Sequence, residues 1–163
     1  MKFSFIIPAK NEEQALALCL RSILSQDYNE GYVEIIVIDD GSTDNTKEVL
    51  SSFIKDKKIK YIHQENLGSA AARNKAIDKA QGEYIAILDA DDVWIDKDKL
   101  KKQIDFLKRN NEYVLVGGGM IIIDANGREI KKYLPPETDE EIRKSILIRN
   151  PFVNSAVVFR KEI

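Results

Sequence analysis

The chain has 163 residues, of which 44% are hydrophobic and 32% charged, and its 25 Lys and Arg against 27 Asp and Glu leave a formal net charge of −2. A chain of this length buries roughly 70% of its unfolded surface, so one core suffices without metal or disulfides. The near-neutral charge, with lysines spread along the sequence, argues against a dedicated nucleic-acid surface. Cys19 and His63 are the only residues of their types, which excludes disulfide frameworks and Cys/His zinc sites and leaves oxygen ligands for any metal.

The first half of the sequence alternates short apolar runs with segments of helical periodicity. The predicted strands cover residues 3–7, 33–38, 59–63 and 84–88. The predicted helices between them follow Asn11 as an N-cap and cover residues 43–54 and 69–80. Pro8 is expected to end the first strand. Strands without alternating polarity, separated by helices, indicate parallel βαβ units buried on both faces.

Apolar stripes identify the core-facing sides of these helices. The stripe of the first helix consists of Leu16, Cys19, Leu20, Ile23 and Leu24. The stripe of the second consists of Val49, Leu50, Phe53 and Ile54. Because Cys19 lies within the first stripe, it is expected to behave as a small buried hydrophobic residue.

The second half of the sequence changes character. A helix over residues 98–110 is expected to turn Leu100, Ile104 and Leu107 inward. Next come an apolar run over 113–123, the Asn126-Gly127 signal of a tight hairpin, and a return through 129–134. The remaining elements are a helix over 138–148 and a strand over 155–160. The sheet is therefore expected to be mixed here, and without a linker the chain is expected to form one domain over residues 1–163.

Chemistry-bearing residues follow the predicted parallel strands. In open parallel sheets ligands bind at the carboxyl ends of the strands. The segments at those ends are residues 8–12, 39–44, 66–73 and 89–92, and they contribute several carboxylates. The acidic groups are thus expected to converge on one edge of the sheet.

Asp89, Asp91 and Asp92 directly follow a buried strand. Three carboxylates in four residues repel one another unless a cation or hydrogen bonds compensate. Mg²⁺ or Mn²⁺, bound by one or two carboxylates plus substrate phosphates, would resolve the repulsion. A solvated acidic turn that caps the next helix is the open alternative. An EF-hand is excluded because Trp94 stands where its glycine must be, and Rossmann and P-loop glycine motifs are absent.

The second strand ends in Asp39 and Asp40, followed by a glycine turn. Ser42 or Thr43 would serve as the N-cap of the next helix, but this does not explain the two acids. A carboxylate here could accept an N–H from a base or a ribose hydroxyl, and Arg73 could complement base or phosphate across the crevice. Taken alone, Arg73 is more typical of a surface cation on a helix.

Four motifs in this order and spacing carry a resemblance to a known family. They are Ile-Ile-Pro-Ala-Lys-Asn-Glu at 6–12, Val-Ile-Asp-Asp-Gly-Ser-Thr-Asp at 37–44, Asn-Leu-Gly-Ser-Ala-Ala-Ala-Arg-Asn at 66–74 and Asp-Ala-Asp at 89–91. The sequence resembles the family 2 glycosyltransferases. The resemblance implies the GT-A fold, a Rossmann-like α/β sandwich, and extends through residues 150–152 and 156–160 to nearly the whole chain.

The resemblance also implies roles for individual positions. Pro8, Glu12 and Asp40 would line the nucleoside pocket, with Asp40 meeting the uracil imide and Arg73 assisting. Asp39 would shape the turn beside them.

At the other end of the site, the resemblance implies that Asp89 approaches the ribose. Asp91 would bind Mn²⁺ or Mg²⁺ bridging the diphosphate of a nucleotide-sugar, and Asp92 has no assigned role. The implied activity is metal-dependent, inverting transfer of a sugar from a UDP-sugar to an acceptor hydroxyl. Because the family's general base is expected beyond Ile163, the chain is expected to be a C-terminally truncated domain that binds donor but transfers sugar poorly.

Two other functions stay open at this point. A phosphatase of the haloacid dehalogenase kind would use Asp89 as a nucleophile, but its motif normally ends the first core strand. A non-catalytic nucleotide-binding module is compatible with a truncated end. The expected setting is cytoplasmic, at the inner face of the membrane where the full-length protein associates with it peripherally. A glycan or lipid-linked acceptor in cell-wall or polysaccharide biosynthesis would fit that setting.

Overall fold

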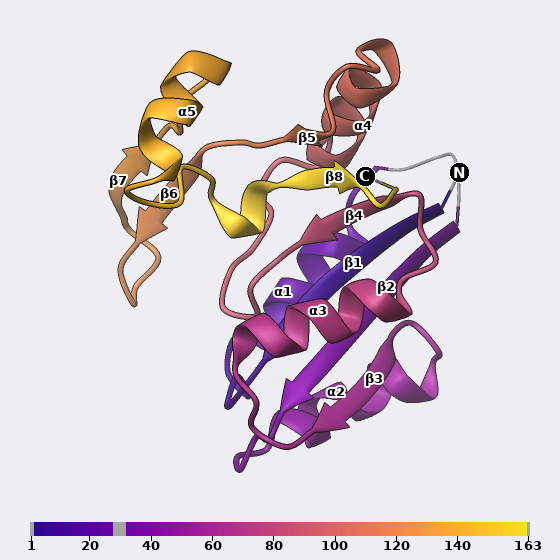
Figure 1. Cartoon of the computed structure of the whole chain (residues 1–163). Helices are drawn as coiled ribbons and strands as arrows, with labels where there is room; N and C mark the ends of the chain where they lie inside the picture. The colour runs from indigo at the N-terminus through magenta and orange to yellow at the C-terminus, as the bar shows by residue number, and fades with distance from the viewer. Residues whose placement is uncertain (1, 28–31, 163) are drawn as a thin grey trace.

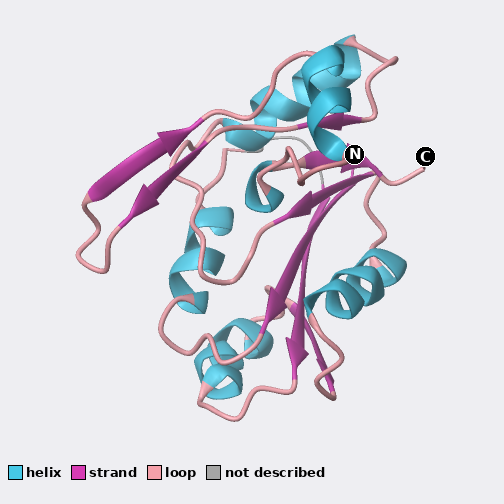
Figure 2. Ribbon diagram, turned by 60° about the vertical axis from the view of Figure 1, so that its left-hand side comes forward, coloured by secondary structure: helices cyan, strands magenta, loops and turns pink. Residues whose placement is uncertain are grey.

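The computed structural model describes residues 2–27 and 32–162, and within them the main body is a six-stranded sheet with helices on both faces (Figures 1 and 2). Its strands are β1 (Lys2–Ala9), β2 (Tyr32–Asp40), β3 (Lys60–Gln64), β4 (Tyr84–Ile87), β5 (Leu115–Val116) and β8 (Val158–Arg160). The helices are α1 (Leu16–Leu24), α2 (Thr46–Lys55), α3 (Ser69–Lys79), α4 (Lys99–Arg109) and α5 (Asp139–Ile146), with the 3₁₀ turn η1 (Asn154–Ala156) before β8.

The strand order is β3-β2-β1-β4-β8-β5. The first four strands of the chain run parallel, whereas β8 is antiparallel to both β4 and β5. This confirms the predicted mainly parallel sheet with a mixed second half. Because β1 lies between β2 and β4, the carboxyl ends of these three strands open onto the same edge of the sheet.

The core has two layers, one on each face of the sheet. Phe5 and Ile7 of β1 belong to a buried cluster with apolar residues of α1, α2 and α4, among them Leu20, Leu50 and Ile104. Ile6, which points to the opposite face, packs with Ala72 and Ala76 of α3. The alternating side chains of β1 are buried on both sides, as expected for a parallel strand between helices. The small residues of α3 let this helix lie close to the sheet.

Two predictions about the first βα unit were wrong. Pro8 does not end the strand but pairs with Ile38 inside β1. The pairing of β4 with β1 stops at Ile6, so the missing N–H of Pro8 costs no bond to β4. Leu24 was expected to face the core, but it is the last residue of α1 and is 40% exposed.

Two predicted helix caps and one strand boundary also differ. Asn11 does not cap α1, because its side chain bonds to the turn after β2. Neither Ser42 nor Thr43 caps α2, which begins at Thr46. Ser155 was predicted in the last strand but lies in the 3₁₀ turn η1. These boundaries depend on contacts between segments far apart in the sequence, which local capping preferences do not encode.

A second, two-stranded sheet stands beside the main body together with α5 (Figure 1). Its strands are β6 (Met120–Ile123) and β7 (Glu129–Tyr133). Gly127 in the connecting turn has a φ of 77°, the left-handed conformation that the Asn-Gly signal predicts. Thr138 and Glu141 form a capping box at the start of α5, which confirms the predicted helix start.

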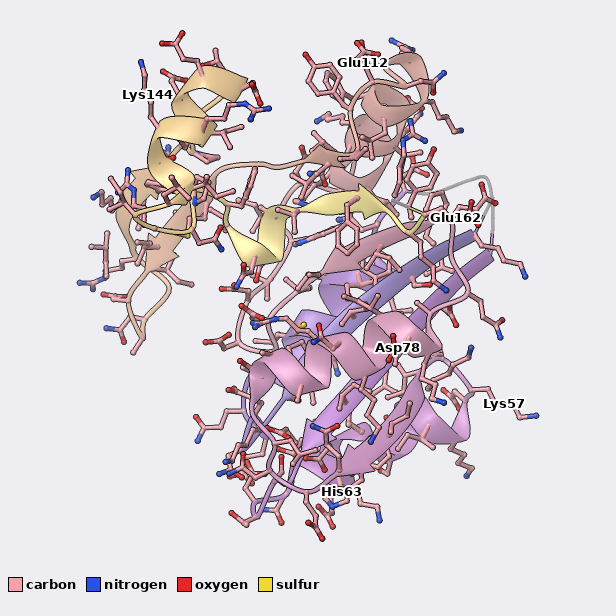
Figure 3. The ribbon with its side chains drawn as sticks, viewed as in Figure 1. Lys57, His63, Asp78, Glu112, Lys144 and Glu162 are labelled. Atoms are coloured by element: carbon pink, nitrogen blue, oxygen red, sulfur yellow. The ribbon has the colours of Figure 1, made fainter. Side chains whose placement is uncertain are left out.

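Charged side chains project from several elements of the main body and of the smaller sheet and α5. Lys57, Asp78, Glu112 and Lys144 lie on four different parts of the fold (Figure 3). No helix within residues 2–27 and 32–162 is long and apolar enough to span a bilayer.

Helix α4 is tied to η1 through two polar side chains. Gln103 Nε2 donates to the carbonyl of Ala156 at 2.8 Å, and Lys99 Nζ donates to Gln103 Oε1 at 2.7 Å. Lys99 Nζ also lies 3.5 Å from the centroid of the Trp94 ring. Desolvation in this position lowers the pKa of Lys99 to about 7, against the opposing attraction of the Asp96 carboxylate.

Stability is therefore expected to depend on pH through Lys99. Between pH about 7 and about 10.4, the unfolded chain binds a proton on Lys99 that the folded chain does not, so the free energy of unfolding rises with pH. The difference in this free energy between wild type and Lys99→Met should increase from pH 7 to pH 10 in urea titrations. Lys101→Met, an exposed change on the same helix, should show no such trend. A difference that does not change with pH for Lys99→Met would contradict the lowered pKa of Lys99.

Candidate functional site

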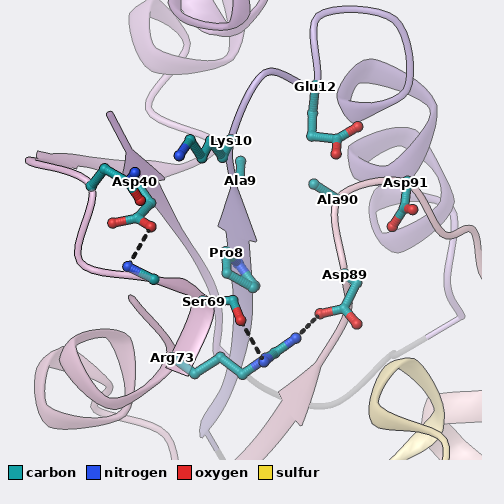
Figure 4. Close-up of a pocket in the computed structure, with 12 residues that line it drawn as sticks. Pro8, Ala9, Lys10, Glu12, Asp40, Ser69, Arg73, Asp89, Ala90 and Asp91 are labelled. Carbon is teal, nitrogen blue, oxygen red and sulfur yellow. Dashed lines mark hydrogen bonds and ion pairs between the residues drawn. The ribbon is translucent and has the colours of Figure 1, made fainter. Parts of the chain in front are cut away.

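A cleft of about 380 Å³ opens at the carboxyl edge of the sheet, between the ends of β1, β2 and β4 and the start of α3 (Figure 4). Its volume lies in the range of small-molecule sites. It is lined by Pro8, Ala9, Lys10, Glu12, Asp40, Asn66, Gly68, Ser69, Arg73, Asp89, Ala90 and Asp91. The structure thus brings every predicted site residue except Asp39 to one cavity, with Asp40 and Asp91 on opposite sides of β1.

Asp40 is a buried carboxylate at the end of β2. Its Oδ1 accepts hydrogen bonds from Gln64 Nε2 at 2.7 Å and from the backbone N–H of Leu67 at 2.8 Å. Its Oδ2 accepts one from the backbone N–H of Gly68 at 2.8 Å. Burial alone would raise the pKa of Asp40, but these bonds, together with the charge of Lys10, hold it below its usual value. Asp40 therefore stays ionised and fixes the loop that leads into α3.

Asp39 is buried behind the cleft rather than within it. It accepts hydrogen bonds from the backbone N–H of Ser42 at 2.9 Å and from the Tyr61 hydroxyl at 2.6 Å, and His63 Nδ1 lies 3.2 Å away. These bonds outweigh desolvation and lower the pKa of Asp39. The geometry is that of a residue that shapes the turn after β2.

Arg73 and Asp89 form an ion pair across the floor of the cleft (Figure 4). Arg73 Nη2 donates to Asp89 Oδ1 at 2.5 Å, and Nη1 donates to Ser69 Oγ at 3.3 Å. Arg73 Nε is buried without a hydrogen-bond partner in the described part of the chain. The helix-surface interpretation of Arg73 is thus wrong, because its guanidinium lines the cleft and spans the gap between α3 and β4.

Acidic residues gather on the side of the cleft that lies across β1 from Asp40 (Figure 4). Desolvation raises the pKa of Glu12, and the charges of Asp91 and Asp44 raise it further. Desolvation also raises the pKa of Asp92, with Asp91 and Asp89 adding to the effect, while a hydrogen bond with Ser155 opposes it. This is the repulsion that the sequence predicted, and a cation would relieve it.

The donor set suits a hard cation that takes only part of its ligands from protein. Among residues 2–27 and 32–162, no three His, Cys, Asp or Glu side chains are gathered closely enough to enclose a metal ion. Asp91 is exposed at the cleft and offers carboxylate oxygens, which Mg²⁺ and Mn²⁺ accept. Mg²⁺ is commonly held by one or two carboxylates plus substrate phosphates, so the residues present fit such an ion.

The loop that carries Glu12 is locked to the turn after β2. The backbone N–H of Asn11 donates to Ser42 Oγ at 2.9 Å, and Asn11 Oδ1 accepts from the backbone N–H of Thr43 at 2.8 Å. The backbone N–H of Glu12 donates to Thr46 Oγ1 at 2.9 Å. Asn11 adopts a φ of 56°, a conformation that Asn tolerates better than most residues. These contacts hold the acidic side of the cleft in place.

The sequence did not single out four polar or glycine residues that line the cleft. They are Lys10, Asn66, Gly68 and Ser69. All four lie in the strand-end segments that the sequence identified, so position at a strand end was the available signal. The residue types at these four positions are common in loops and did not by themselves indicate a binding site.

Comparison with known proteins agrees with this architecture. A putative teichuronic acid biosynthesis glycosyltransferase, TuaG of Bacillus subtilis, is 36% identical over 151 residues, which cover 88% of this chain and 58% of that protein. An uncharacterised glycosyltransferase of Haemophilus influenzae is 43% identical over 130 residues, covering 78% of this chain and 50% of its own length. The chain thus spans about half the length of these curated relatives.

Solved structures share the fold over almost the whole chain. Staphylococcus aureus TarS in complex with UDP-GlcNAc has a TM-score of 0.71 at 27% identity, covering 99% of this chain and 46% of that chain. Its complex with UDP gives 0.69 at 26%, covering 99% and 47%. The mannosyltransferase PcManGT of Pyrobaculum calidifontis, in complex with GDP-Man and Mn²⁺, has a TM-score of 0.71 at 22% identity, covering 97% and 44%, and shows the GT-A fold alone.

The family model described as glycosyl transferase family 2 matches residues 4–162. With this match over nearly all of its length, the chain belongs to glycosyltransferase family 2.

Proposed function

We propose that the cleft binds a uridine diphosphate sugar and that the enzyme transfers the sugar to an acceptor hydroxyl with the help of Mn²⁺ or Mg²⁺. The observation that supports this proposal is that Asp40 and Asp91 line the same cleft. In the proposal, Asp40 reads the base and Asp91 binds the metal ion. The complexes of TarS with UDP and UDP-GlcNAc support a nucleotide-sugar of this kind.

Hydrogen-bond capacity at Asp40 favours uracil over guanine. A carboxylate offers about four acceptor positions, and Gln64, Leu67 and Gly68 already occupy three of those on Asp40. The remaining position on Oδ2 suits a single imide N–H, as uracil presents. Guanine presents adjacent N1–H and amino donors, which need two acceptors side by side. Pro8 and Glu12 would complete the nucleoside pocket, and Asp39 would support it from behind.

The ion pair between Arg73 and Asp89 lies between the base side and the acidic side of the cleft. Asp89 uses Oδ1 for Arg73, which leaves Oδ2 to accept hydrogen bonds from the ribose hydroxyls. Arg73 would offer its remaining donors to base or phosphate. Because both side chains restrain each other, the ribose is met by a fixed carboxylate rather than a mobile one.

Asp91 would hold the divalent ion beside the diphosphate. When bound, such an ion supplies positive charge that stabilises the departing nucleoside diphosphate. Asp91 lines the cleft. Neighbouring carboxylates add to desolvation in raising the pKa of Glu12 and Asp92, and this negative field would draw a cation there. Inversion at the anomeric carbon completes the proposed reaction.

The acceptor in this proposal is a glycan or a lipid-linked glycan in polysaccharide or cell-wall synthesis. The similarity to Bacillus subtilis TuaG, a putative teichuronic acid biosynthesis glycosyltransferase, supports this choice. Such an acceptor would bring the full-length enzyme to the cytoplasmic face of the membrane, without nucleic acid as a partner.

Removing the Asp91 charge should abolish the metal dependence of UDP binding. In calorimetry, Mn²⁺ is expected to strengthen UDP binding to wild type at least about tenfold, and Asp91→Asn should lose that gain, because the ion loses its protein ligand. Asp78→Asn, the same change at an exposed position of α3 outside the cleft, should behave as wild type. An unchanged Mn²⁺ effect in Asp91→Asn would refute the metal assignment. Hydrolysis of p-nitrophenyl phosphate that Asp89→Asn abolishes would instead support the phosphatase.

Base selectivity can be measured without altering the protein. UDP should bind at least about tenfold more tightly than CDP, because cytosine presents a lone pair at N3 where uracil presents an N–H to Asp40. GDP should also bind more weakly, since Asp40 lacks a second free acceptor. All three nucleotides carry the same diphosphate, so the comparison at constant Mn²⁺ isolates the base. Equal affinity for UDP and CDP would show that the base does not meet Asp40.

A further inference from the structure

The acidic turn after β4, residues 89–92, is fastened to a distant residue. The backbone N–H of Asp89 donates to Ser155 Oγ at 3.0 Å. Trp94, just beyond the turn, donates through Nε1 to the backbone carbonyl of Ser155 at 2.6 Å. Ser155, a single buried residue of η1, thus bonds both to the first residue of the acidic turn and to Trp94 just after it.

Ser155 is itself held by the rigid part of the fold. The carbonyl of the next residue, Ala156, accepts hydrogen bonds from Gln103 Nε2 at 2.8 Å and from Lys99 Nζ at 3.4 Å. Beyond it, Val158 pairs with Ala86 in the antiparallel ladder between β8 and β4. Ser155 is therefore anchored to α4 on one side and to the central sheet on the other.

The contacts of Ser155 reach both functional parts of the turn. Its bond to the N–H of Asp89 fixes the residue whose carboxylate pairs with Arg73. The turn is closed by a bond from the N–H of Asp92 to the carbonyl of Asp89 at 3.1 Å, and Asp91 lies inside that turn. The direction in which Asp91 faces the cleft thus depends on the backbone that Ser155 holds.

We propose that Ser155 is a positioning residue that sets the acidic turn for the metal-bound diphosphate. The inference rests on the proposed function, because it concerns the presentation of Asp91 to the ion. Ser155 does not line the cleft, so it acts through its contacts with the backbone of Asp89, the side chain of Asp92 and Trp94. Without its hydroxyl the amide of Asp89 loses its acceptor and the turn gains alternative conformations, among which fewer present Asp91 correctly.

The test compares Ser155→Ala with Ser155→Thr, which retains a hydroxyl. Mn²⁺ binding at saturating UDP is followed by the paramagnetic resonance signal of free Mn²⁺, and metal-free UDP binding by calorimetry. Ser155→Ala should raise the dissociation constant for Mn²⁺ about five- to thirtyfold and change metal-free UDP affinity less than about twofold. Ser155→Thr should restore most of the loss, and Ser52→Ala, at an exposed position of α2, should match wild type.

Trp94→Phe gives a second variant that leaves the Ser155 hydroxyl in place. It removes only the Nε1 donor and should weaken Mn²⁺ binding in the same direction but less. Equal losses of UDP affinity with and without Mn²⁺ in Ser155→Ala would indicate general damage to the fold and overturn the proposal. Mn²⁺ binding as in wild type would also overturn it.

Amide hydrogen exchange separates this inference from the proposed function. In Ser155→Ala the Asp89 amide should exchange at least about tenfold faster than in wild type, with or without nucleotide. If wild type binds no UDP in the presence of Mn²⁺, the proposed function fails and the positioning role falls with it. The exchange rate then still decides whether Ser155 holds the turn, and an unchanged rate refutes the inference by itself.

Discussion

The buried carboxylate of Asp40 is the constraint on which the rest of the site depends. An ionised group in this position is stable only with several hydrogen-bond donors, and the loop before α3 supplies them from Leu67 and Gly68. Those bonds fix where α3 starts, and α3 carries Arg73 to the end of β4. The position of Asp89 is thus linked through one helix to a charge at the end of β2.

The local pattern of residues predicted the elements and the edge of the sheet where the site lies. A parallel sheet could be predicted because apolar, β-branched runs alternate with helices. The carboxyl ends of the strands in such a sheet meet at one edge. The hydrogen-bond partners of individual residues could not be predicted from the sequence. Asn11 resembles a helix cap, but its side chain bonds to Thr43, 32 residues further along the chain. Ser155 resembles the start of a strand, yet it contacts a turn 66 residues earlier. Contacts of this range depend on tertiary packing, which residue preferences do not contain.

Charge is distributed unevenly even though the chain is nearly neutral. Acidic side chains gather at one side of the cleft, while Lys10 lies near Asp40 and Arg73 pairs with Asp89 (Figure 4). A nucleoside diphosphate brings further negative charge, so binding is opposed on the acidic side unless a cation enters with it. Hydrogen-bond donors around Asp40 lower its pKa, whereas desolvation and nearby carboxylates raise the pKa of Glu12 and Asp92.

An Asp-x-Asp segment after a strand is compatible with both phosphoryl and glycosyl transfer, so the surroundings of the motif must distinguish them. A phosphatase would need Asp89 free to attack phosphorus, whereas here Arg73 occupies one of its oxygens and Ser155 fixes its backbone. It would also leave Asp40 and its bound loop without a function at the far side of the same cleft. A nucleotide long enough to reach from Asp40 to Asp91 uses both sides, which is why the topology around the motif favours transfer of a nucleotide-bound sugar.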